Sequence, residues 1–196
     1  MSPRMAWRAI QSALPRDAII SSDIGNNCAI GNAYPTFEEG RKYLAPGLFG
    51  PCGYGLPSIM GAKIGRNDVP VVGFAGDGAF GISMNEMSAI GREEWPAITM
   101  VIFRNYQWGA EKRNTTLWFE DNFVGTELDE QVSYASIAKA CGVEGIAVDS
   151  MDELRDALAK AVDAQMKDGV TTFIEVMLNQ ELGEPFRRDA MKKPVS

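Results

Sequence analysis

The sequence predicts an α/β protein in which a doubly wound, mostly parallel sheet is flanked by helices. The main observation is that short apolar runs typical of buried strands alternate with helical patterns, for example at 70–75, 79–93 and 97–103. The second observation is size, because 196 residues, of which 45% are hydrophobic, suffice for one domain with a sizeable core. Such alternation favours parallel strands joined by crossover helices.

The other elements follow in a regular order along the chain. Ser2 followed by Pro3 is typical of a helix start, and Pro15 ends that helix. Residues 1–183 are expected to form one domain, and 184–196 a C-terminal tail that we expect to be truncated. Further strands are expected at 18–22, 146–148 and 171–178, and further helices at 56–64, 133–141 and 150–169.

Two segments lack a clear periodicity. Residues 31–57 are rich in glycine and proline, and no charged residue occurs from 44 to 60. A loop of this length inside a compact domain is usually functional, so we expect it to lie under a cofactor or a partner chain. Residues 110–130 mix charged and aromatic side chains, which is typical of a lid, an interface or an ordinary surface loop.

The composition excludes several classes of function. A net charge of −7 argues against binding to nucleic acids or anionic membranes, since both need basic surfaces. No apolar run approaches ~18 residues and no signal-peptide pattern opens the chain, so we expect a cytoplasmic protein. The chain has no histidine, which excludes histidine-based acid–base catalysis from its own residues and disfavours a zinc site.

Polar residues follow two neighbouring predicted strands where each strand ends. Gly76-Asp77-Gly78 follows the first strand and opens a helix, and Arg104-Asn105-Tyr106-Gln107 follows the second. The helix-start amides of Gly78 and Ala79 would attract an anion, whereas the Asp77 carboxylate would repel it by roughly 4 kcal/mol at ~4 Å. A divalent cation between carboxylate and anion removes this conflict. The sequence therefore indicates a diphosphate held through Mg²⁺ by Asp77, Asn105 and a carbonyl near Gln107.

The same residues allow other interpretations. Residues 76–81 match the G-x-G-x-x-G pattern of dinucleotide-binding folds, in which Arg104 could contact a 2′-phosphate. A single match is not specific, however, and Asp77 would then face the pyrophosphate without a counter-ion. The glycines could also form a purely structural turn. Similarly, residues 25–27 after the first strand could donate to the same anion or form an Asx-rich turn.

Several motifs together resemble the diphosphate-binding domain of thiamine-diphosphate-dependent enzymes of the acetolactate synthase type. They are the stretch from Ser21 to Gly25, the motif at 53–57, Gly76-Asp77-Gly78, and Asn105. The resemblance covers nearly the whole chain and implies the thiamine-diphosphate-binding fold, with thiamine diphosphate and Mg²⁺ as cofactors. It also implies that Asp77 and Asn105 are side-chain ligands of the metal and that Gln107 supplies a carbonyl.

The resemblance implies further contacts with the cofactor. The Gly50 carbonyl would receive the amino group of the cofactor. Cys52 would lie beneath the V-shaped cofactor, as a smaller wedge than the usual apolar residue of the family. The diphosphate would be held by two glycine-containing turns, comprising Gly25, Asn26, Asn27, Gly76, Gly78 and Ala79.

The resemblance also suggests a reaction. Residues 21–37, 45–57 and 103–114 are most similar to members of the family that act on a sulfonated aldehyde. These enzymes release sulfite and transfer an acetyl group to phosphate. By charge and position, Arg104, Lys112 and Arg113 are candidate contacts for the sulfonate or the phosphate.

The resemblance implies partners as well. The activating glutamate of the family comes from a pyrimidine-binding domain, usually of a partner subunit, and the chain resembles only about the last third of such an enzyme. We therefore expect it to be inactive alone and to belong to a homo-oligomer in the full enzyme. Two other functions stay open: the small subunit of a split thiamine-diphosphate-dependent 2-keto acid decarboxylase, and a non-catalytic module that binds Mg²⁺–diphosphate.

Overall fold

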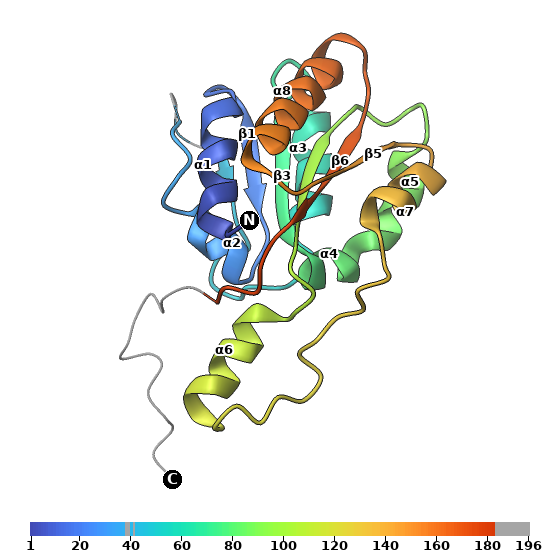
Figure 1. Ribbon diagram of the computed structural model, residues 1–196. Coiled ribbons are helices and arrows are strands. Elements are labelled where there is room, and N and C mark those ends of the chain that lie inside the picture. The colour runs from blue at the N-terminus through green and yellow to red at the C-terminus, as the bar shows by residue number, and fades with distance from the viewer. Residues whose placement is uncertain (38–39, 41, 183–196) are drawn as a thin grey trace.

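A parallel sheet forms the centre of the protein (Figure 1). The structure is a computed structural model that describes residues 1–37, 40 and 42–182, so the predicted tail at 184–196 lies outside the described residues. Within the described part, six strands pair in the order β2-β1-β3-β4-β6-β5, and every pair of neighbours is parallel. The strands are β1 (Ile19–Ser22), β2 (Tyr43–Leu44), β3 (Val71–Gly76), β4 (Thr99–Arg104), β5 (Glu144–Val148) and β6 (Thr172–Met177).

Helices cover both faces of the sheet, as the predicted doubly wound α/β fold requires. One face packs against α1 (Pro3–Ala13), α2 (Asn26–Gly31) and α8 (Met151–Lys167). The opposite face packs against α3 (Gly55–Gly65), α4 (Asp77–Ser83), α5 (Met87–Ile90) and α7 (Tyr134–Ala140). None of the helices in the described part of the chain has both the length and the apolar character needed to cross a membrane.

The central strands are apolar because both of their faces are buried. Successive side chains of a strand point to opposite faces, so Phe74 and Phe103 join the core under α1 and α8. Their neighbours Ala75 and Ile102 join the core under α3 and α4. Packing on both faces thus holds β3 and β4 in place, and the polar motifs follow directly after these two strands.

Trp7 ties α1 and α2 to the sheet. Its ring lies 4.7 Å from the ring of Phe74 and 5.2 Å from that of Phe103, measured between centroids. The indole Nε1 donates a hydrogen bond of 2.8 Å to the carbonyl of Asn27 in α2. A Cβ atom on Gly31 would lie only 2.1 Å from the Trp7 ring, so α2 is held closely against this side chain. The amino end of α2 is thereby placed beside the end of β1.

The structure corrects several predicted elements. The helix expected at 79–93 begins already at Asp77 and is interrupted by a 3₁₀ turn (η1, Met84–Glu86) before α5 ends at Ile90. The interruption begins at Ser83, whose φ of −105° and ψ of 7° lie outside the helical range. Within the segments 31–57 and 110–130, for which no regular element was expected, the structure forms the two-residue strand β2 and most of the helix α6 (Gly109–Trp118). The short helix α2 was not predicted either and overlaps the turn expected at 25–27. Figure 1 shows α6 projecting beyond the sheet on the side where β4 ends.

Candidate cofactor and metal site

The polar motifs meet at the carboxyl edge of the sheet. The chain passes from β1 outward to β2 and then returns to β3 on the other side of β1, so the strand order reverses between β1 and β3. Open parallel sheets bind ligands in the crevice that forms outside the strand ends at such a reversal. The segments at this edge begin at Asp23 after β1, at Asp77 after β3 and at Asn105 after β4.

Asp77 connects the ends of β3 and β4. Its Oδ2 accepts hydrogen bonds from the backbone amides of Asn105 at 3.0 Å and Tyr106 at 2.7 Å, and its Oδ1 accepts one from Gly78 at 3.0 Å. Burial raises the pKa of the Asp77 carboxyl to about 6, although the three amide donors and the Arg104 charge act in the opposite direction. The two loops therefore face each other, with a buried carboxylate between them.

Buried polar atoms without a described partner lie on the segments that meet at this edge of the sheet. Among the described residues, such side-chain atoms are Asn27 Oδ1, Asn105 Oδ1, Gln107 Oε1, Arg113 Nε and Thr126 Oγ1. Their segments are neighbours, because the Trp108 amide donates to the Thr126 carbonyl at 2.8 Å and Arg113 Nη1 donates to Asn26 Oδ1 at 3.0 Å. Buried polar groups are almost always hydrogen-bonded in proteins. A cluster of exceptions at one edge of the sheet indicates a polar ligand.

The donor set suits Mg²⁺ rather than a softer metal. Mg²⁺ takes one or two carboxylate or amide oxygens from a protein and completes its octahedron with phosphate and water. Asp77 would supply a carboxylate, and Asn105, whose exposed fraction is 1%, would supply an amide oxygen that has no partner among the described residues. The described residues contain no group of three or more His, Cys, Asp or Glu side chains that could hold a metal by themselves. The ligand would therefore have to contribute oxygens of its own.

The predicted diphosphate contacts lie on both sides of this position. Gly76 ends β3, while Gly78 and Ala79 are buried in the first turn of α4. A Cβ atom on Gly78 would lie 2.9 Å from the Trp108 ring, so only glycine leaves this turn undisturbed. Gly25 precedes α2 with a φ of 125°, a backbone conformation that favours glycine, and the buried Asn26 and Asn27 follow it.

Asp23 is a residue whose role the sequence did not reveal. Its Oδ2 accepts a hydrogen bond of 2.6 Å from the Gly55 amide, and its Oδ1 accepts one of 3.1 Å from Gly53. Burial raises the pKa of the Asp23 carboxyl, against the opposing effect of these amides. Asp23 thus anchors the segment that contains the half-buried Cys52 to the end of β1. Gly50 also approaches this strand end, because a Cβ atom there would lie 3.5 Å from Ile24.

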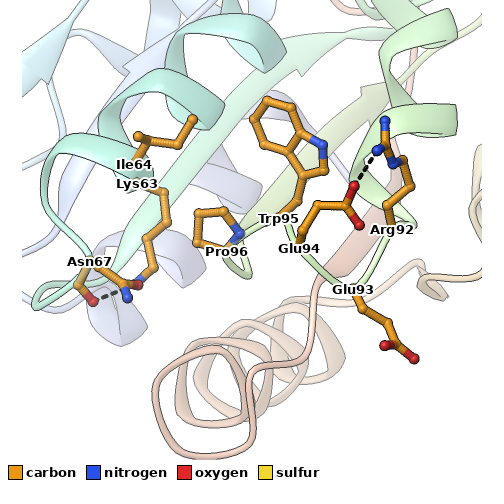
Figure 2. A pocket seen from close by; sticks show the side chains of 8 residues that line it. All are labelled: Lys63, Ile64, Asn67, Arg92, Glu93, Glu94, Trp95 and Pro96. Carbon is orange, nitrogen blue, oxygen red and sulfur yellow. Dashed lines mark hydrogen bonds and ion pairs between the residues drawn. The ribbon is translucent and has the colours of Figure 1, made fainter.

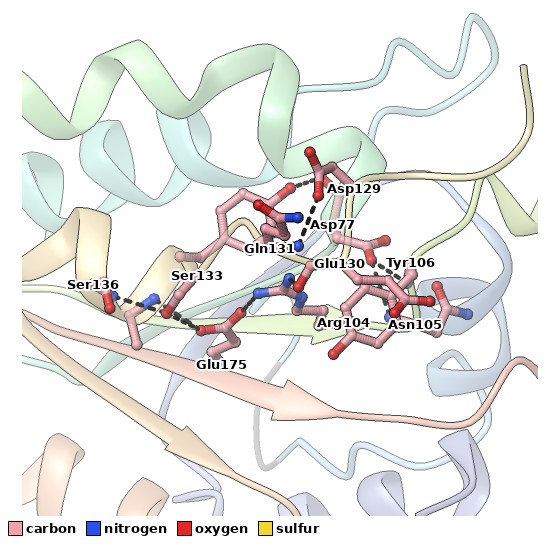
Figure 3. A network of polar contacts seen from close by, with 12 residues as sticks. Asp77, Arg104, Asn105, Tyr106, Asp129, Glu130, Gln131, Ser133, Ser136 and Glu175 are labelled. Atoms are coloured by element: carbon pink, nitrogen blue, oxygen red, sulfur yellow. Dashed lines mark hydrogen bonds and ion pairs between the residues drawn. The ribbon is translucent and has the colours of Figure 1, made fainter.

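The three predicted anion contacts differ in availability. Arg104 is buried and forms an ion pair with Glu175, as Figure 3 shows, so the structure does not support its predicted contact with a substrate anion. Lys112 is paired with Glu127 at the surface. Arg113 contacts the Asn26 side chain, and burial lowers its pKa.

A large cavity lies elsewhere. A pocket of ≈ 710 Å³ opens beside the segments that precede β3 and β4, at the amino edge of the sheet (Figure 2). Three of its four charged lining residues have partners, because Arg92 pairs with Glu94 and Lys63 donates to the carbonyl of Val69 at 2.9 Å, and the fourth is Glu93. A smaller cavity of ≈ 200 Å³ touches the candidate site and is lined in part by Asp23 and Gly25. The candidate site is therefore identified by its polar residues and not by the volume of its cavity.

Comparison with known proteins identifies the family of the chain. The family model described as "Thiamine pyrophosphate enzyme, C-terminal TPP binding domain" matches residues 23–176, thiamine pyrophosphate being thiamine diphosphate. The sulfoacetaldehyde acetyltransferase of Roseovarius nubinhibens is 79% identical over 196 residues, which are 100% of this chain and 32% of that protein. A probable sulfoacetaldehyde acetyltransferase of Rhizobium meliloti is 76% identical over 196 residues, again 100% of this chain and 33% of that protein.

A solved structure supports the fold. The benzoylformate decarboxylase of Polynucleobacter necessarius superposes with a TM-score of 0.83 at 20% sequence identity, over 94% of this chain and 34% of that one.

The chain spans about a third of the length of the curated relatives it matches. The family match includes the segments around Asp23, Asp77 and Asn105. The chain belongs to the thiamine pyrophosphate enzymes and contains their C-terminal cofactor-binding domain.

Proposed function

We propose that the chain is the cofactor-binding part of an enzyme that converts sulfoacetaldehyde and phosphate into acetyl phosphate and sulfite. The 79% identity to a sulfoacetaldehyde acetyltransferase over the whole chain supports this substrate. The observation that carries the proposal is the buried Asp77 carboxylate, which faces the loop of Asn105. The side-chain oxygen of Asn105 has no hydrogen-bond partner among the described residues. When bound, thiamine diphosphate supplies carbanion chemistry at its thiazolium ring.

The residues of the chain would bind and orient the cofactor. Asp77 and Asn105 would hold Mg²⁺ through their side chains and Gln107 through its carbonyl. The amides of the turns after β1 and β3 would bind the diphosphate, since backbone N–H groups at helix starts attract anions. Gly50 and Cys52 would position the rest of the cofactor, and Asp23 keeps their segment in place through its bonds to Gly53 and Gly55.

Two cations near the site are candidates for binding the sulfonate or the phosphate. Arg113 has a buried Nε atom without a hydrogen-bond partner in the described part of the chain, and its Nη1 donates to Asn26, a proposed contact of the diphosphate. Lys112 is the neighbouring residue and is already paired with Glu127, so we expect it to contribute less. Loss of Arg113 should therefore raise the KM for sulfoacetaldehyde or phosphate more than loss of Lys112.

The proposal includes partners that the chain does not supply. We propose that the activating glutamate comes from a pyrimidine-binding domain, that the full enzyme is a homo-oligomer, and that it works in the cytoplasm. The test uses an assembled enzyme, in which this chain replaces the matching third of the Roseovarius relative. Calorimetry should detect thiamine diphosphate binding that depends on Mg²⁺ in the assembled enzyme.

The matched variants give the test its specificity. Asp77→Ala should abolish Mg²⁺-dependent binding, whereas Lys167→Met, at an exposed ion pair on α8, should leave it unchanged. Acetyl phosphate should form from sulfoacetaldehyde and phosphate only in the variants that bind the cofactor. Cofactor binding without any product would instead indicate another reaction or a non-catalytic module, and Asp77→Ala binding as tightly as wild type would refute the metal site.

A further inference from the structure

A buried ion pair lies beside the candidate site without being part of it. Arg104 at the end of β4 pairs with Glu175 of β6, and their side chains are only 4% and 2% exposed (Figure 3). Moving two charges out of water is costly, and a buried pair is weak evidence for stability by itself. The contacts around the pair indicate what it does.

The pair holds the chain between α6 and α7 against the sheet. Arg104 Nη2 donates to the Glu130 carbonyl at 2.8 Å. Glu175 Oε2 accepts hydrogen bonds from the Ser133 hydroxyl at 3.1 Å and from the Ala135 amide at 3.0 Å. Besides bonding to each other, the two side chains are thus hydrogen-bonded to Glu130, Ser133 and Ala135 of this segment. Figure 3 shows the pair with Glu130 and Ser133 beside it.

The same pair supports both neighbours of Asp77. The Arg104 guanidinium lies 4.6 Å from the ring centre of Tyr106 and 5.6 Å from that of Tyr134. Tyr106 donates its amide to Asp77 Oδ2, while the Tyr134 hydroxyl donates to the Asp77 carbonyl at 3.2 Å. Tyr106 has a φ of 60°, which is disfavoured for a bulky residue, so this loop conformation needs support from outside.

We propose that Arg104 and Glu175 form a positioning pair that holds Asp77 and Asn105 in the geometry needed to bind the metal. The guanidinium stacks on Tyr106 and stabilises the backbone conformation in which the amides of residues 105 and 106 both point to Asp77. Neither residue is among the proposed ligands of the metal or the proposed contacts of the cofactor. Because it rests on the proposed Mg²⁺ site, the inference predicts weaker metal binding when the pair is altered.

The test measures the Mg²⁺ concentration that gives half-maximal thiamine diphosphate binding in the assembled enzyme. Arg104→Lys keeps a charge opposite Glu175 but loses the planar face and the second donor arm. A double variant, Arg104→Met with Glu175→Gln, removes both charges and leaves neither one buried alone. We expect about 10- to 100-fold higher half-saturating Mg²⁺ in both, as for other residues that orient metal ligands. Maximal binding should return to the wild-type level at saturating Mg²⁺.

Controls separate positioning from folding. Lys167→Met should match wild type, and thermal unfolding without ligands should leave Arg104→Lys near the wild-type midpoint. Unchanged Mg²⁺ dependence in both variants would overturn the inference, as would loss of folding in both, since the pair would then be needed simply to fold. Failure of the wild type itself to bind thiamine diphosphate would overturn the proposed function, and the positioning role with it.

Discussion

Asp77→Asn should leave the metal-free protein at least as stable as wild type, although it removes the central charge of the site. Burial raises the pKa of Asp77 from 3.8 to about 6, so the ionised form costs about 3 kcal/mol at neutral pH, which the neutral amide avoids. The carboxylate accepts three backbone amides, whereas the single oxygen of asparagine can accept two. One unsatisfied amide costs about 1–3 kcal/mol. At about pH 7.5 the variant should therefore equal wild type or exceed it by up to about 2 kcal/mol.

The stability difference between wild type and Asp77→Asn should depend on pH in a defined direction. Because the folded-state pKa lies above the unfolded one, protonation of Asp77 stabilises the folded protein, fully below pH 3.8, and this stabilisation is lost as the pH rises through about 6. Between about pH 7.5 and about pH 5, wild type should gain about 1.4 kcal/mol relative to Asp77→Asn. Comparison of the two proteins cancels the effects of the other titrating groups.

Urea unfolding in EDTA, followed by tryptophan fluorescence at both pH values, measures the two free energies. The reasoning would be refuted by a variant that is more than about 3 kcal/mol less stable at about pH 7.5, or by a difference that does not change with pH. Thiamine diphosphate and Mg²⁺ should raise the midpoint of the assembled wild-type enzyme but not that of the variant. The two results together would show that the buried Asp77 charge is needed to bind the cofactor and is not needed for the stability of the fold.

Three further predictions concern packing. Gly31→Ala should lower the thermal midpoint, because the new methyl group would overlap the buried Trp7 ring, with an expected cost of about 1–3 kcal/mol. Phe103→Ala should cost about 3–5 kcal/mol in urea unfolding, because the ring is fully buried against Trp7. Gly78→Ala should change stability little but weaken thiamine diphosphate binding about tenfold in calorimetry, since it displaces the half-buried Trp108 from the turn after β3; wild-type affinity would contradict this.

The fold could be predicted from the sequence because its signals are local. The β3 and β4 strands are apolar runs that end at polar motifs, and the helices α1 and α8 begin at Ser2 and Ser150, whose side chains accept the capping hydrogen bonds. Parallel strands end at the same edge of a sheet. The proximity of Asp77 to the Asn105 loop could therefore be predicted from the strand topology alone.

The parts that could not be predicted depend on contacts between distant residues. Nothing local to Arg104 indicates that its partner is Glu175, 71 residues away, so its charge suggested an anion contact instead. Likewise Asp23 reaches Gly53 and Gly55 only after β1 and α3 have come together. The helix α6 lies in a segment whose aromatic and charged residues follow no single face, and periodicity therefore did not predict it.

The partnerless atoms of the site argue for a ligand with two kinds of charge. Asn27, Asn105 and Gln107 each present a buried oxygen that needs a cation or a donor, whereas Arg113 presents a buried N–H that needs an anion. Each such group costs about 1–3 kcal/mol when unsatisfied, a large share of the ~5–15 kcal/mol stability of a domain. A bare anion would satisfy only the arginine, and a bare cation only the oxygens. A metal–diphosphate complex offers both, so its binding would stabilise the carboxyl edge of the sheet as a whole.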